Sequence, residues 1–168
     1  MGEMMNIICK HLIRLKNTLY RRYKMFLWHI QYGDRINLKK FHFRNGFRIY
    51  LEENGILKIG KNTFFNNNCS ITVRRQVEIG ENCIFGENVK IYDHNHNFKD
   101  MNTLICRQGF SSAKIKIEDD CWISSNVIIL KGVTIGKHSV IGAGVIVYKD
   151  VPCNSVLICK QNIIMHNQ

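Results

Sequence analysis

The sequence predicts an all-β protein, a parallel β-helix of six-residue repeats that carries an N-terminal amphipathic α-helix and a protruding loop. Three observations lead to this prediction. An apolar residue recurs every six positions, a turn-forming residue stands at a fixed place in most repeats, and the N-terminal part follows a helical period instead. We therefore divide the chain into a basic N-terminal helical segment, residues 1–48, and a β-helix domain, residues 49–168.

Large apolar side chains define the six-residue period. It is regular apart from two extra residues between Ile71 and Ile79, and it resumes at Ile117 after a gap. A period of six is not a multiple of the 3.6 residues of an α-helical turn, so it predicts very short parallel strands. Three repeats would close one triangular coil, and stacked coils would share one apolar core. The repeated positions are Ile59, Phe65, Ile71, Ile79, Phe85, Ile91, Ile117, Ile123, Ile129, Ile135, Ile141 and Val147.

The corners of these coils are predicted three residues after most of the apolar positions. The residue types found there, Gly, Asn, Asp and His, tolerate a left-handed backbone conformation better than others do. Arg74 is the exception. The next residue is small or β-branched, which gives Cys69, Cys83 and Cys121 a packing role. The predicted corners are Asn62, Asn68, Asn82, Asn88, Asp120, Asn126, Gly132, His138, Gly144 and Asp150.

A polar, irregular stretch from about residue 93 to residue 114 interrupts the repeat. Loops of this length inside a compact repeat structure are usually functional or disordered. We expect an arm that leaves the β-helix at a fixed height and that holds His94 and His96 at its root.

Residues 4–30 have the pattern of a basic amphipathic helix. The net charge of the chain is +11, and residues 1–48 carry eleven Lys and Arg against two acidic residues. We expect the helix to pack its apolar face on its own protein (on the trimer that the resemblance described below implies), with peripheral contact to an anionic membrane surface as the alternative. Nucleic acid is disfavoured as a partner because the aromatic residues follow the helical period and form no separate stacking platform.

The sequence favours a cytoplasmic protein, with peripheral contact at the inner face of the membrane as an extension. No apolar run approaches the roughly 18 residues of a membrane-spanning helix, and no cleavable signal pattern stands at the N-terminus. Seven cysteines without a C-x-x-C pair fit a reducing compartment better than a disulfide framework.

Four motifs stand out in the repeat domain: Ile-Tyr-Asp-His-Asn-His at 91–96, the stretch 121–136, Val-Ile-Gly-Ala-Gly at 140–144, and Lys-Asp-Val-Pro at 149–152. Together they resemble the hexapeptide-repeat acyltransferases, in particular the galactoside/maltose acetyltransferases and the related capsule and O-antigen acetyltransferases. The resemblance covers residues 60–156. It implies a left-handed parallel β-helix, a homotrimer, and acetyl-CoA as the acyl donor, with no metal expected.

The resemblance also implies roles for individual residues. His96 matches the catalytic histidine of the family, and His94 is the other candidate. An acceptor-binding asparagine matches Asn66, whereas Arg74 replaces an acidic residue of the family and suits an anionic or phosphate-bearing acceptor. The acyl-CoA contacts of the family match Trp122, the backbone N–H groups of Ser125 and Ala143, and the pair Tyr148 and Lys149.

The residues themselves support this chemistry. Transfer of an acyl group from a thioester to a hydroxyl needs a base with a pKa near the working pH, and histidine is the natural candidate. A fixed backbone N–H, most simply that of Ser125, stabilises the developing oxyanion. Asp93 is a candidate to orient an imidazole, with a role as a loop cap as the equal alternative.

The leading hypothesis is therefore an acetyl-CoA-dependent O-acetyltransferase that acts on a sugar hydroxyl, with a role in surface polysaccharide biosynthesis. An N-acyltransferase acting on an amino sugar is the nearest alternative, because no residue distinguishes a hydroxyl from an amine. Two other classes stay open: a non-catalytic β-helix scaffold, and a carbonic anhydrase-like protein that binds zinc through His94, His96 and His138.

Overall fold

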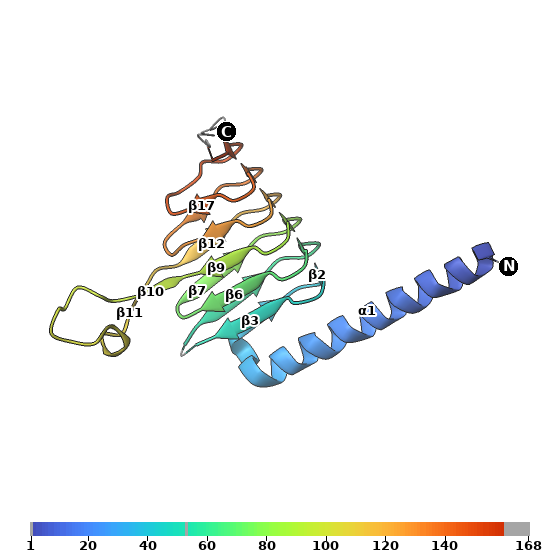
Figure 1. Cartoon of the computed structure of the whole chain (residues 1–168), viewed down its shortest axis with the longest axis horizontal. Coiled ribbons are helices and arrows are strands. Elements are labelled where there is room, and N and C mark those ends of the chain that lie inside the picture. The colour runs from blue at the N-terminus through green and yellow to red at the C-terminus, as the bar shows by residue number, and fades with distance from the viewer. Residues whose placement is uncertain (1, 53, 160–168) are drawn as a thin grey trace, which may run out of the picture.

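The computed structural model describes residues 2–52 and 54–159, and the end of the predicted β-helix domain, residues 160–168, lies outside this range. The six-residue repeats form short strands that stack into three parallel sheets, the three faces of a prism (Figure 1). This confirms the predicted left-handed parallel β-helix. We name the faces A, B and C in chain order.

Each face takes one strand from successive coils. Face A contains β1 (Ile36–Leu38), β4 (Ile56–Ile59), β7 (Gln76–Ile79), β12 (Ile115–Ile117) and β15 (Thr134–Ile135). Face B contains β2 (His42–Phe43), β5 (Phe64–Phe65), β8 (Ile84–Phe85), β13 (Trp122–Ile123), β16 (Val140–Ile141) and β18 (Val156–Leu157). Face C contains β3 (Arg48–Leu51), β6 (Ser70–Val73), β9 (Lys90–Tyr92), β14 (Ile128–Ile129) and β17 (Ile146–Val147).

The apolar period and the corners lie where the sequence places them. All twelve predicted apolar positions are at most 3% exposed and form one core. Nine of the ten predicted corners adopt a positive φ, between 57° and 83°. Asp150 does not; its carboxylate instead accepts a hydrogen bond from the N–H of Thr134 (2.7 Å), and Asn154 (φ 59°) turns the next corner.

The β-helix begins earlier than residue 49, the boundary that we predicted. Strands β1, β2 and β3 pair in parallel with β4, β5 and β6, so residues 36–51 form the first coil. In this coil Leu38 and Phe43 occupy the positions of Ile59 and Phe65 in the next coil. They are five residues apart, not six, which broke the period and hid the coil from the sequence analysis.

The N-terminal segment is one helix, α1 (Gly2–Tyr32), followed by the short 3₁₀ helix η1 (Gly33–Arg35). Its C-terminal end covers the base of the prism. The Trp28 ring lies 5.3 Å from the ring of Phe43, and the Tyr32 hydroxyl donates a hydrogen bond to the carbonyl of Ile49 (3.1 Å). No helix in the described part of the chain is long and apolar enough to cross a membrane.

The arm leaves the prism after β9 and returns before β12 (Figure 1). It contains β10 (His94–His96), the 3₁₀ helix η2 (Ile105–Arg107) and β11 (Phe110–Ser112). Strands β10 and β11 pair in antiparallel fashion, so the predicted protruding loop has an ordered two-stranded root. The arm therefore holds its histidines at a defined height on the prism.

Candidate functional site

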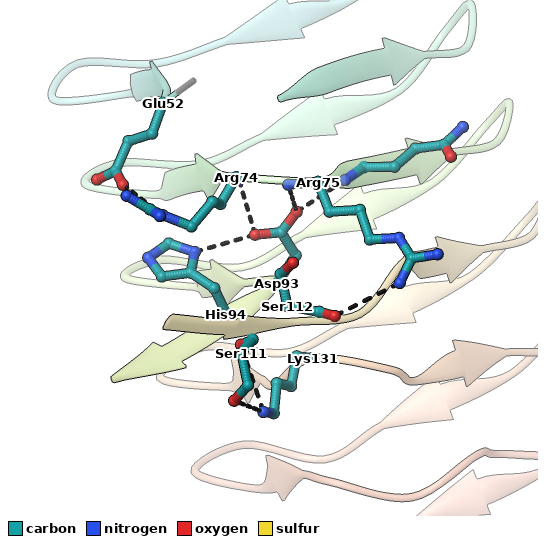
Figure 2. Close-up of polar contacts among 9 residues, drawn as sticks. Glu52, Arg74, Arg75, Asp93, His94, Ser111, Ser112 and Lys131 are labelled. Atoms are coloured by element: carbon teal, nitrogen blue, oxygen red, sulfur yellow. Dashed lines mark hydrogen bonds and ion pairs between the residues drawn. The ribbon is translucent and has the colours of Figure 1, made fainter. Parts of the chain in front are cut away.

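A buried carboxylate fixes the root of the arm. Asp93 follows β9 directly and is 0% exposed. Its Oδ1 accepts a hydrogen bond from the backbone N–H of Arg74 (2.8 Å), and its Oδ2 accepts bonds from the N–H groups of Arg75 (2.7 Å) and Gln76 (2.8 Å) (Figure 2). A buried charge is stable only with such donors. Asp93 therefore ties the arm to the coil below it.

The same carboxylate orients His94. The Nδ1 atom of His94 lies 3.0 Å from Oδ1 of Asp93, and the His94 side chain is only 11% exposed (Figure 2). The sequence left open whether Asp93 orients an imidazole or caps a loop, and the geometry includes both contacts. The imidazole that it meets belongs to His94, while His96 has no contact with Asp93 in the described structure.

Phe110 holds the two histidines and Arg74 in one cluster. Phe110 pairs with His96 across β10 and β11, and their rings lie 4.3 Å apart. The His94 ring meets Phe110 edge-on at 5.5 Å, and the Arg74 guanidinium lies 3.7 Å from the centre of the Phe110 ring. Phe110 was not predicted from the sequence, because only the pairing of β10 with β11 brings it beside His96.

Arg74, which we predicted to bind the acceptor, lies against the root of the arm. Its Nε donates to the carboxylate of Glu52 (3.1 Å), and its side chain is only 17% exposed (Figure 2). Its guanidinium stacks on Phe110, a favourable cation–π arrangement. We conclude that Arg74 buttresses the arm root.

A polar pocket of about 730 Å³ lies between the arm and the prism. His96 lines it, together with the positively charged side chains of Lys99, Arg107 and Lys131. The Lys131 ammonium also donates hydrogen bonds to the carbonyl oxygen and the hydroxyl of Ser111, which fixes it against β11 (Figure 2). His94 does not line this pocket. The pocket therefore offers one accessible imidazole surrounded by positive charge.

Ser125 and Ala143 stack at the corner between faces B and C. Ser125 follows β13 and Ala143 follows β16, and the carbonyl of Ser125 accepts a hydrogen bond from the N–H of Gly144 (3.0 Å). The backbone N–H groups of Ser125 and Ala143 donate to no other group in the described residues. Two neighbouring unused donors at a surface corner are suited to hold carbonyl oxygens of a ligand.

The other predicted ligand-binding residues lie on three parts of the prism. Trp122 is 52% exposed on face B, immediately before the Ser125 corner. Asn66 lies at the same corner on a lower coil, where its side-chain Oδ1 accepts a hydrogen bond from the backbone N–H of Asn67 (2.9 Å). Tyr148 and Lys149 follow β17 on face C and line a pocket of about 690 Å³ at the C-terminal end of the prism.

The candidate residues thus form two groups on one protomer. The histidine corner, between faces C and A, contains Asp93, His94 and His96 and the arm. The amide corner, between faces B and C, contains Ser125 and Ala143, with Trp122 beside it. Because face C separates the two corners, a single chain does not bring a base and an amide donor to the same point.

The described part of the chain contains no set of metal ligands. No three His, Cys, Asp or Glu side chains come together to hold an ion anywhere in the described residues. His138, the third histidine of the zinc hypothesis, turns a corner with φ 57°, and its Nδ1 lies 2.7 Å from Asp120.

Residues 114–149 match the repeat described as bacterial transferase hexapeptide (six repeats). The chain therefore contains the hexapeptide repeat that this description names. This hexapeptide-repeat protein is 38% identical to the galactoside O-acetyltransferase of Escherichia coli over 108 residues, which are 64% of the chain and 52% of that protein. The chain spans about half the length of the sequence relatives that it matches.

Solved structures of two acetyltransferases superpose on this hexapeptide-repeat protein. A hexapeptide-repeat acetyltransferase of Vibrio cholerae in complex with acetyl-CoA has a TM-score of 0.64 and 29% identity, over 74% of this chain and 66% of that one. A maltose O-acetyltransferase of Clostridium difficile has a TM-score of 0.63 and 28% identity, over 86% of this chain and 82% of that one.

Proposed function

We propose that this protein is an acetyl-CoA-dependent O-acetyltransferase that acts on a sugar hydroxyl, with a role in surface polysaccharide biosynthesis. The observation that carries the proposal is the amide corner, where Ser125 and Ala143 present unused N–H groups beside an exposed Trp122. Support comes from the similarity to acetyltransferases, one of which was solved with acetyl-CoA and another of which is named for maltose.

His96 is the proposed general base. A base must reach the acceptor hydroxyl, and His96 lines the arm pocket while His94 is turned toward Asp93. The acceptor hydroxyl gives its proton to His96 as its oxygen attacks the thioester carbonyl. The N–H of Ser125 stabilises the oxyanion that forms. When the C–S bond breaks, the proton passes from His96 to the departing sulfur, and the products are an acetyl ester and coenzyme A.

The arm pocket is the proposed acceptor site. Lys99, Arg107 and Lys131 surround His96 there, and Asp100 is the one acidic side chain in its lining. This charge favours an acceptor that carries a carboxylate or a phosphate near the reacting hydroxyl. Arg74 had already suggested an anionic acceptor in the sequence. Lys99, Arg107 and Lys131 are the residues that we propose to contact it.

A homotrimer is the proposed active form. The histidine corner and the amide corner lie on opposite edges of face C, so each is half of a site. In a cyclic assembly every interface is the same, and the histidine corner of one subunit can meet the amide corner of the next. Three identical sites would then lie between the subunits.

The test is titration of the purified protein with acetyl-CoA by calorimetry, followed by thiol release over a panel of neutral, acidic and amino sugars. We expect saturable binding and acetyl ester formation, checked by mass spectrometry. Trp122→Ala should weaken acetyl-CoA binding by about tenfold, because an exposed tryptophan at a binding site is a frequent energetic anchor. Ile56→Ala removes another exposed apolar side chain, on face A, and should leave binding unchanged.

Three results would contradict the proposal. Failure to bind any acyl-CoA would show that the protein is not an acyl-CoA-dependent transferase. If Trp122→Ala and Ile56→Ala weaken acetyl-CoA binding equally, acetyl-CoA does not bind at the site that we assign beside Trp122. If the acetyl group is transferred only to amino sugars, the protein is an N-acetyltransferase and not an O-acetyltransferase.

A further inference from the structure

Helix α1 has an apolar stripe that the described chain leaves uncovered. Seven side chains recur along it at intervals of three or four residues, so they share one side of the helix. All of them are between 50% and 67% exposed. We call this set the outer stripe; it consists of Ile8, Leu12, Leu15, Leu19, Tyr23, Phe26 and Ile30.

The outer stripe faces away from the β-helix. The helix docks on the prism through Trp28 and Tyr32, which are 6% and 7% exposed. At 3.6 residues per turn, these two side chains project on roughly the opposite side from the stripe. Figure 1 shows α1 leaving the base of the prism and running outward beyond the coils. The stripe therefore cannot fold back onto the prism of its own protomer without giving up the Trp28 contacts.

The charge of the helix identifies what covers the stripe. Helix α1 contains six Lys and Arg and a single acidic residue, Glu3. Packing of α1 against the same helix of a second copy would bring these cations together, and each helix would offer only Glu3 to offset them. An anionic lipid surface offers the opposite charge together with an apolar layer, which is the environment that a basic amphipathic helix requires.

We propose that α1 is an interfacial membrane helix, which lies in the plane of an anionic membrane with its outer stripe in the headgroup–acyl boundary. The β-helix then stands on the side of the helix that holds Trp28 and Tyr32. Among the alternatives that the sequence left open, this one replaces packing of the helix on its own trimer. It does not depend on the catalytic proposal, because the helix and the two corners share no residue.

The test is flotation of the full chain with vesicles of phosphatidylglycerol and phosphatidylcholine, and with vesicles of phosphatidylcholine alone. We expect binding to the anionic vesicles that falls as salt is raised, and little binding to the neutral ones. Leu19→Glu should reduce the vesicle–water partition coefficient by about 10- to 100-fold, since it replaces a leucine that would be buried in the lipid with a charged residue. Asn17→Glu adds the same charge on another side of the helix and should reduce it less than about fivefold.

Sedimentation velocity and circular dichroism on the same variants complete the test. Leu19→Glu should keep the wild-type assembly and helix content. If it instead dissociates the assembly, the stripe belongs to a second copy and the proposal is overturned. Absence of binding to anionic vesicles overturns it as well, and so does equal loss with Leu19→Glu and Asn17→Glu.

Discussion

His96→Ala is expected to lower kcat by about 100-fold or more, in line with the loss of a general base. The affinity for acetyl-CoA should change little, because Trp122 and the N–H groups of Ser125 and Ala143, the proposed acetyl-CoA contacts, are unaltered. The fold should also persist, since the His96 side chain is exposed and packs on Phe110 at the surface of the arm. Thiol release under saturating acetyl-CoA measures kcat, and calorimetry measures the affinity.

His94→Ala is the matched comparison for this prediction. It also removes an imidazole, but from the first residue of β10, where Asp93 holds the ring. We expect a smaller loss of turnover, about tenfold, from disturbance of the arm root. Added imidazole should restore part of the activity of His96→Ala and none of that of His94→Ala. Wild-type turnover in His96→Ala, or rescue of His94→Ala alone, would move the base to His94.

Ser125→Pro is expected to lower kcat by about 100- to 1,000-fold, the effect of removing one oxyanion donor. Ser125 precedes Asn126, whose φ of 60° gives this corner the form of a type II turn with Ser125 at its second position. Proline is favoured at that position, so the substitution removes the N–H and keeps the turn. The measurements are thiol release and the melting temperature.

The control is Ser125→Ala, which keeps the N–H and removes the hydroxyl. That hydroxyl accepts a hydrogen bond from the N–H of Glu87 (3.1 Å), so a modest loss of stability is expected, about 1 kcal/mol, with turnover near wild type. If Ser125→Ala is as inactive as Ser125→Pro, the hydroxyl and not the backbone N–H supports the reaction. If Ser125→Pro is fully active, the oxyanion is stabilised elsewhere.

The sequence predicts the prism well because its pattern is local. A buried residue such as Ile129 and a corner such as Asn126 are separated by a fixed count within each repeat, so both can be read without knowing the fold. The first coil escaped because Leu38 and Phe43 are five residues apart, which breaks the count although the coil still pairs with the next.

The candidate site was predicted less completely because its contacts are not local. Phe110 reaches His96 only through the pairing of β10 with β11, and Arg74 meets Glu52 across neighbouring coils. The residue types at positions 93–96 indicated a base and an acid but not which imidazole the acid holds. The separation of the histidine corner from the amide corner depends on where each residue falls around the prism, which becomes clear once the strands are assigned to faces.

The central claim is that each active site joins the histidine corner of one subunit to the amide corner of the next, and mixed assemblies test it directly. His96→Ala and Ser125→Pro subunits with different affinity tags are co-expressed, and assemblies that carry both tags are purified. In a cyclic trimer of both kinds one site combines two intact corners, so about one third of wild-type turnover is expected from two inactive parents. Mixed assemblies as inactive as either parent would contradict a site shared between subunits.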